Sequence, residues 1–190
     1  MMDSIQRLSE SVSIDGIEYE INTDFKVWVE IEHLFFSTER GDAEKLARVL
    51  ALAYPSLPHN PIEAVKGVLW FYSGGKESGE HGEREDIVKM PFYDLKEDFS
   101  YVWGAFLSEF GIDLTQVSLH WWKFRALLCC LSENCKFSKI VAYRSLDTSS
   151  IKDTKQRQFY EKMKRSFRLK CAFREELKEK QLTNSLEGLF

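Results

Sequence analysis

The sequence predicts a mostly helical single domain with one small β-hairpin near its N-terminus. Between residues 95 and 110, apolar residues recur every three or four positions, and the same spacing returns between residues 117 and 131. Such spacing places the apolar side chains on one face of an α-helix. The strongest strand signal is the alternation of apolar residues around Asp15-Gly16, a pair that tolerates the positive φ of a tight turn. With 190 residues, 44% of them hydrophobic, the chain can bury a core without disulfides or metals.

The first half of the chain divides into a polar end, a hairpin and three helices. Residues 1–11 are polar and are expected to be disordered, and residues 12–21 form the hairpin. The next helix is DFKVWVEIEHLFF, which is apolar around much of its circumference and is therefore expected near the centre of the core. A second helix begins after Gly41 and is stopped by PSLPHNP, whose last proline, Pro61, opens a third helix.

The second half begins after a segment rich in glycine and charge, residues 73–90, which is expected to be a mobile loop. The helix that follows ends at Gly111, because glycine suits a left-handed C-cap. Further helices are predicted in LHWWKFRALLCCL and FSKIVAYRSL. We expect the main domain to span residues 12–169 and a helical tail to occupy residues 170–190.

The charge is unevenly distributed along the chain. The formal net charge is −4, which does not favour a nucleic-acid partner. Residues 152–180, however, carry 11 Lys and Arg against 5 Asp and Glu. A basic C-terminal arm on an acidic body indicates an acidic partner for the arm.

The stretch LHWWKFRALLCCL has two interpretations, a functional site or a buried helix. On a helix its apolar residues share one face, which predicts a core stripe of Trp121, Phe124, Leu128 and Leu131. His120 would need a nucleophile or a carboxylate partner to act as a general base, and the sequence identifies neither. We therefore expect a structural histidine, no catalytic residue and no enzymatic activity.

Metal and cofactor sites are not indicated either. The four cysteines have no CxxC spacing and no accompanying histidine pair, so they are expected to be small apolar residues rather than zinc ligands. The segment SGGKES departs from a phosphate-binding loop, because Trp70 stands where the first glycine should be and Glu77 follows the lysine. No apolar run approaches the length of a membrane span, and the N-terminus does not resemble a signal peptide.

Several segments, in this order, resemble the bacteriophage gene-product-fifteen family. They are GIEYEINTDF, YDLKEDFSYVWGAFLSEFGIDL, LHWWKFRALLCCL, KIVAYRSLDTSSIKD and FYEKMKRSFRL. Together they cover roughly residues 14–169, and the succession of GIDL, LHWWKF, YR and KMK is distinctive. The sequence departs from the family at the CC pair and in the tail from Cys171 onward.

The resemblance implies a protein of long-tailed phages and prophages, encoded near the tape-measure protein. Genes in this position commonly encode tail assembly chaperones, so the resemblance implies a partner in the tape-measure protein or another tail protein, in the host bacterial cytoplasm. It implies no catalytic activity and no cofactor, and it leaves open a homo-oligomer and retention in the finished tail. A helical nucleic-acid-binding or regulatory protein is the alternative, motivated by the basic arm.

The basic arm is the predicted contact surface for the partner. Its apolar residues step by four along one helix and are flanked by cations, which suits docking into a groove. The predicted partner-binding residues are Phe159, Met163, Phe167, Lys162, Lys164 and Arg165. Packing of the same stripe on the chain's own core is the alternative.

Overall fold

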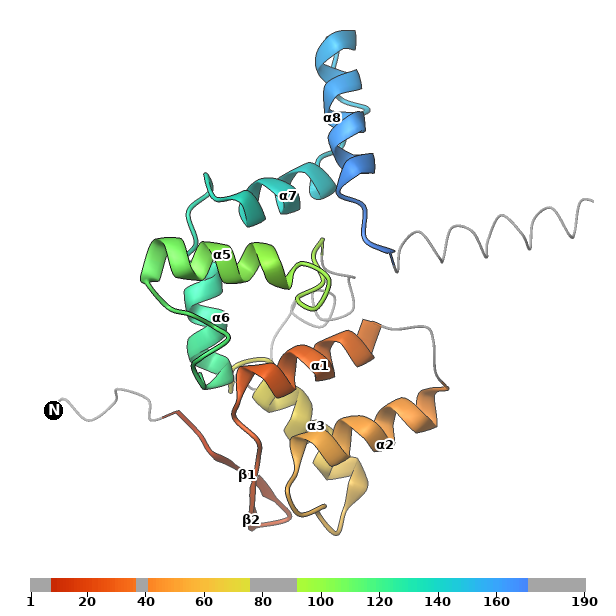
Figure 1. The fold of residues 1–190 in the computed structure, drawn as a ribbon. Coiled ribbons are helices and arrows are strands. Elements are labelled where there is room, and N and C mark those ends of the chain that lie inside the picture. Colours follow the sequence, from red (N-terminus) through yellow and green to blue (C-terminus); the bar gives the residue numbers. More distant parts are fainter. Residues whose placement is uncertain (1–7, 37–40, 76–91, 171–190) are drawn as a thin grey trace, which may run out of the picture. The chain divides into compact units, whose positions relative to one another are not determined.

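The computed structural model describes residues 8–36, 41–75 and 92–170, and within them the chain is mostly helical with one small hairpin (Figure 1). The predicted fold class is therefore confirmed. The elements are β1 Ser11–Ile14, β2 Ile17–Glu20, α1 Phe25–Phe36, α2 Asp42–Ala53, α3 Pro61–Tyr72, α5 Phe99–Phe110, α6 Trp121–Cys129, α7 Lys136–Ser145 and α8 Thr154–Ser166. Most of the expected N-terminal disorder, loop and tail fall on residues 1–7, 76–91 and 171–190, which lie outside the described residues.

Contacts within the chain group into two compact units. Unit 1 comprises residues 1–90 and 106–131, and unit 2 comprises residues 91–105 and 132–190. Helix α5 contributes residues to both units, because the boundary at 105/106 falls within it.

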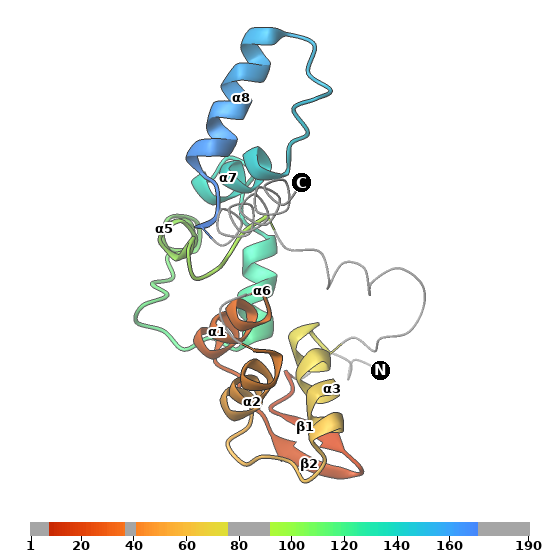
Figure 2. The same cartoon turned by 90° about the vertical axis from the view of Figure 1, so that its right-hand side faces the viewer.

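In unit 1 the hairpin closes through the turn that the sequence predicts. Asp15 and Gly16 have φ values of 52° and 79°, so both central residues have the left-handed conformation of a type I′ turn. The strands are antiparallel, with Val12 opposite Tyr19. Val12 and Ile14 are buried, and β1 packs against α3 (Figure 2). The hairpin thus packs against a helix. This packing stabilises it, because a two-stranded hairpin alone is only marginally stable in water.

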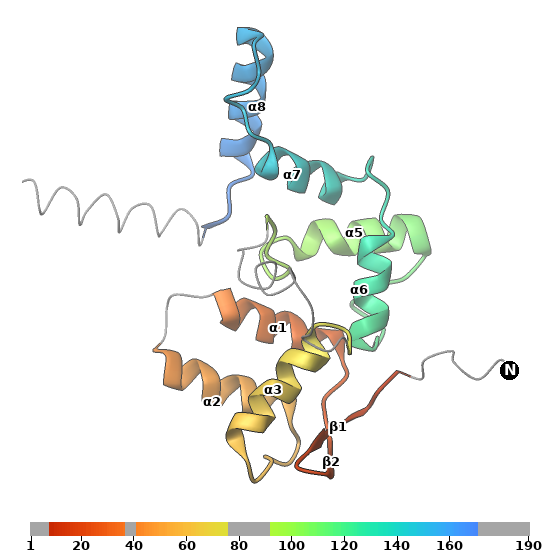
Figure 3. The same cartoon turned by 180° about the vertical axis from the view of Figure 1, so that it is seen from behind.

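An aromatic stack fills the core of unit 1. Trp28 of α1 stacks on Phe71 of α3, with ring centroids 4.8 Å apart, and lies 6.1 Å from Trp121. Phe124 stacks on Phe25 at 4.8 Å, so α1 and α6 meet through these two rings. Figure 3 shows the start of α1 beside α6. The side chains of this stack are almost fully buried, which explains why the first helix is apolar on several sides.

Helices α2 and α3 of unit 1 approach closely at Gly67. A Cβ atom at this position would lie 2.5 Å from the hydroxyl of Tyr54, the residue that ends α2, and 3.3 Å from Val12 Cγ2. Tyr54 is 3% exposed and donates its hydroxyl hydrogen to Ala64 O at 2.9 Å. A glycine inside a helix costs stability, and here it makes room for a buried tyrosine.

Unit 2 is built from the start of α5, together with α7 and α8. Leu95, Val102, Phe137 and Ile140 are buried in it, and α7 packs against α8. Leu169, just after α8, is also buried. The chain is thus packed up to the end of the predicted main domain.

Candidate partner-binding surface

The HWW stretch opens α6, and its histidine is a helix cap. His120 Nδ1 accepts a hydrogen bond from the backbone N–H of Trp122 at 3.1 Å, as an N-cap side chain does. Since Nδ1 accepts, Nε2 carries the proton and donates to Ser9 O at 2.9 Å. His120 also pairs with Asp24 in an antiparallel bridge, which joins the start of α6 to the start of α1. Both ring nitrogens are engaged by the backbone, as a structural histidine requires.

The two tryptophans and an arginine of α6 cap the C-terminal end of α3. Trp121 Nε1–H donates to Tyr72 O at 3.1 Å, and Trp122 Nε1–H donates to Phe71 O at 2.7 Å. Arg125 also donates to Tyr72 O and lies over the rings of Tyr72 and Trp121. The last carbonyls of a helix lack intrahelical partners and carry partial negative charge, so indole donors and a guanidinium both stabilise this end.

The glycine pair after α3 belongs to the same cap. Gly74 and Gly75 have φ values of 88° and 79°, and their N–H groups return to Phe71 O and Trp70 O. A Cβ atom on Gly75 would lie 2.7 Å from the Trp122 ring. The described part of SGGKES is therefore a helix stop that makes room for a tryptophan.

The expected core stripe of α6 has three buried members. Trp121 and Phe124 are each 1% exposed and Leu131 is 9% exposed, whereas Leu128 is only half-buried. Cys129 and Cys130 are exposed on the last turn rather than packed as apolar filler, and Cys135 caps α7 through its sulfur. In the described part of the chain, no group of three or more His, Cys, Asp or Glu side chains could hold a metal ion.

Helix α8 carries five of the six predicted partner-binding residues, and the sixth, Phe167, is its C-cap. The Asp153 side chain accepts from the N–H of Gln156 at 2.9 Å and caps the start of the helix. Lys164 and Arg165 lie in the last turn, where cations favour the C-terminal end of the helix dipole. The C-cap of α8 is Phe167, whose backbone N–H donates a hydrogen bond to Met163 O.

One face of α8 packs on α7. Tyr143 of α7 stacks on Phe167, with centroids 6.2 Å apart, and also contacts Tyr160. Lys136 lies over the Phe167 ring at 4.9 Å, and Lys164 Nζ donates to Leu146 O at 2.7 Å. Three members of the predicted binding set, Met163, Phe167 and Lys164, are half-buried, and the last two make the contacts just described.

The opposite face of α8 is exposed and basic. Phe159 is 50% exposed, and Lys155, Lys162 and Arg165 are exposed around it. Among the described residues these three cations have no ion pair or side-chain hydrogen bond. Lys155 precedes Phe159 by four positions and Lys162 follows it by three, so Lys155, Phe159 and Lys162 lie along one side of the helix. Arg165 follows Lys162 by three positions and extends this row toward the end of the helix. We call Lys155, Phe159, Lys162 and Arg165 the outer stripe.

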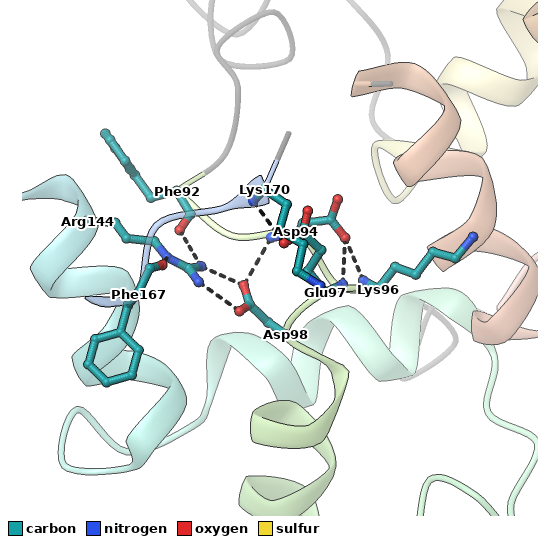
Figure 4. Close-up of polar contacts among 8 residues, drawn as sticks. All are labelled: Phe92, Asp94, Lys96, Glu97, Asp98, Arg144, Phe167 and Lys170. Atoms are coloured by element: carbon teal, nitrogen blue, oxygen red, sulfur yellow. Dashed lines mark hydrogen bonds and ion pairs between the residues drawn. The ribbon is translucent and has the colours of Figure 1, made fainter. Parts of the chain in front are cut away.

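A buried ion pair anchors the segment that carries α8 (Figure 4). Arg144 of α7 binds both carboxylate oxygens of Asp98, at 2.6 and 2.9 Å. The same guanidinium donates to Phe167 O at 2.5 Å and to Phe92 O at 3.1 Å. Lys170 N–H donates to Glu97 at 3.0 Å. Arg144 thus joins α7, the start of α5 and the end of α8 within unit 2.

The loop before α8 contains Asp147, an acidic residue that is not part of the outer stripe. Asp147 accepts from the N–H and the hydroxyl of Ser149, both at 2.9 Å. Chiefly because of these bonds, the pKa of Asp147 lies below its ordinary value.

A family model described as Bacteriophage Gp15 protein matches residues 5–169. The chain belongs to the bacteriophage Gp15 family. The resemblance in the sequence motifs is thereby confirmed, and the matched region contains both the α3 cap and the outer stripe. The comparisons found no matching curated protein and no matching solved structure.

Sequence reasoning missed two features of this Gp15 protein. It kept Phe159, Met163 and Phe167 together as one slowly drifting stripe and did not separate Phe159 from Phe167, although two steps of four residues move the side chain 80° around the helix. It also gave Arg144 no role. The YR pair was visible, but its acid, Asp98, lies 46 residues away.

Within the described residues, no helix is long and apolar enough to cross a membrane.

Proposed function

We propose that this Gp15 protein acts in phage tail morphogenesis as an assembly chaperone that binds the tape-measure protein in the cytoplasm of the host bacterium. The observation that carries the proposal is the outer stripe of α8, an exposed aromatic side chain among three exposed cations. Family membership supports a phage protein, and the resemblance implies the tail partner.

The physical requirement for such a helper is reversible contact with helical, apolar surface. A tape-measure protein is long and helical and tends to aggregate. A chaperone must therefore expose apolar side chains for contact and charges for solubility. On the outer stripe, Phe159 supplies the first and the three cations supply the second. Binding of this kind needs no catalytic residue and no cofactor.

Co-expression tests this function. The tape-measure protein, tagged, is produced with and without the Gp15 protein, and its soluble fraction is measured after lysis. We expect the soluble fraction to rise several-fold and both proteins to be recovered in one affinity step. Equal solubility in both cultures and no co-purification would refute the proposed function.

A nucleic-acid-binding role is the second candidate, because α8 carries five cations and one acid. Phosphate contacts would weaken steeply with salt. Gel shifts with single- and double-stranded DNA at low salt test this role, and a shift abolished by Lys155→Glu together with Lys162→Glu would support it.

A further inference from the structure

The outer stripe of α8 has a definite spacing of charged and apolar groups. We infer that it binds an acidic amphipathic helix of its partner, with an apolar side chain of that helix seated on Phe159 and its carboxylates on Lys155 and Lys162. This inference rests on the proposed function and specifies the chemistry of the segment that is bound.

The charges of the stripe point outward and are available. Arg144, Lys136 and Lys164 of the same unit are occupied by Asp98, by the Phe167 ring and by Leu146 O. In the described part of the chain, Lys155, Lys162 and Arg165 have no such partner. Fixed cations without counter-charges raise the local concentration of an acidic segment and favour its binding.

The aromatic side chain favours a protein over a nucleic acid. Phe159 is 50% exposed, although its ring touches Tyr160. Burying a half-exposed phenyl ring against an aliphatic side chain is favourable, because apolar surface is removed from water. The backbone of a nucleic-acid duplex offers no apolar surface for this contact. An acidic and apolar peptide matches both properties of the stripe.

The spacing predicts the pattern of the bound helix. Lys155 and Lys162 are seven residues apart, which places their Cα atoms about 10.5 Å apart along the helix axis. A partner helix running alongside matches this distance with acids at positions i and i+7 and an apolar residue at i+3 or i+4. The tape-measure sequence can be searched for this pattern before any binding experiment.

A synthetic peptide tests the inference directly. The probe is a fluorescent 18-residue Ala- and Gln-rich helix with Glu at positions 5 and 12 and Leu at positions 8 and 9. Its affinity for the full-length protein is measured by anisotropy. We expect saturable binding that weakens with added salt, because exposed charges are screened. A peptide with Lys in place of both Glu should bind at least tenfold more weakly.

Two variants and one matched control complete the test. Lys155→Glu with Lys162→Glu should lower the affinity for the acidic peptide at least tenfold, and Phe159→Ser should lower it severalfold. Lys123→Glu with Lys139→Glu changes the net charge equally at exposed positions of α6 and α7 and should leave the affinity within twofold. Circular dichroism checks that each variant retains its helicity and melting temperature.

The outcomes separate the inference from the proposed function. Unchanged peptide affinity in the Lys155 and Lys162 variant overturns the inference, as does tighter binding of an 18-nucleotide single-stranded DNA. If the tape-measure protein co-purifies equally with the wild type and with this variant, the proposed function stands and the inference fails. If the peptide binds as expected but the tape-measure protein never co-purifies, the chemistry of the stripe stands and the proposed partner is wrong.

Discussion

Replacing Arg144 with Met removes a guanidinium that makes four hydrogen bonds in unit 2. Two go to Asp98, at 2.6 and 2.9 Å, and two go to the carbonyls of Phe167 and Phe92. The Asp98 side chain is only 3% exposed. In the variant the carboxylate keeps a hydrogen bond from the N–H of Asp94 at 3.1 Å but loses its counter-charge.

The expected loss of stability follows from this burial. Removing one partner of a buried ion pair leaves an uncompensated charge and costs about 3–5 kcal/mol. A small domain is stable by only about 5–15 kcal/mol in total. We therefore expect Arg144→Met to lower the melting temperature by well over 5 °C and to release the end of α8 first. Arg144→Met combined with Asp98→Leu removes both charges and should recover much of the loss, because an apolar pair can replace a buried ion pair.

Urea unfolding followed by circular dichroism measures the free energy of unfolding of the wild type, Arg144→Met, Asp98→Leu and the double variant. Lys139→Met is the matched control, since Lys139 is exposed on the same helix and should change the free energy of unfolding by less than about 0.5 kcal/mol. Amide hydrogen exchange along α8 gives the local readout. A loss below about 1 kcal/mol in Arg144→Met, or a double variant weaker than both single variants, would refute the assignment of Arg144 as the anchor of α8.

Three further predictions concern unit 1. Gly67→Ala should destabilise the protein by about 1–3 kcal/mol in thermal unfolding, because the new Cβ would lie 2.5 Å from the Tyr54 hydroxyl. This loss is expected although alanine is the better helix former. If Tyr54→Phe does not restore the stability of Gly67→Ala, this contact is not the cause. Burial raises the pKa of Tyr54 from 10.0 to about 12. The contribution of the protonated Tyr54 hydroxyl to stability is therefore present below pH 10 and is lost, at about 1.4 kcal/mol per pH unit, as the pH rises toward 12. Alkaline unfolding of Tyr54→Phe should lack this pH-dependent loss, and a pH profile identical to that of the wild type would contradict the assignment. Trp121→Ala should cost about 3–5 kcal/mol in urea unfolding, because the side chain is 1% exposed; an unchanged midpoint with lost partner binding would make Trp121 part of a binding site instead.

The sequence predicted the features of the fold that depend on residues close together in the chain. The Asp15-Gly16 turn, the Pro61 helix start and the apolar stripe of α6 each depend on residues within one or two turns of each other. The turn and the helix start appear in the structure as expected, and three of the four stripe residues are buried. The residue pattern also indicated a helix in the basic arm, and α8 carries most of the predicted partner-binding residues.

Long-range partners were beyond this reasoning. The donors from Trp121 and Trp122 reach carbonyls about 50 positions earlier in the chain, and periodicity carries no signal for such a pairing. The division of the predicted stripe depends on which side of α8 meets Tyr143, and that is decided by packing. The grouping into two units likewise depends on contacts between distant segments, which amphipathicity does not encode.

The tryptophans are distributed unequally between the two units, and this has a practical consequence for spectroscopy. Trp28, Trp70, Trp121 and Trp122 belong to unit 1, and Trp103 alone belongs to unit 2. Trp28 and Trp121 stack on each other with ring centroids 6.1 Å apart, and Trp121 stacks on Tyr72 at 5.7 Å, so their emission depends on the intact stack. Intrinsic fluorescence therefore reports chiefly on melting of unit 1, and a Trp103→Phe variant makes it a reporter of that unit alone. Far-ultraviolet ellipticity sums the helices of both units, so a temperature gap between the two signals would measure how independently the units unfold.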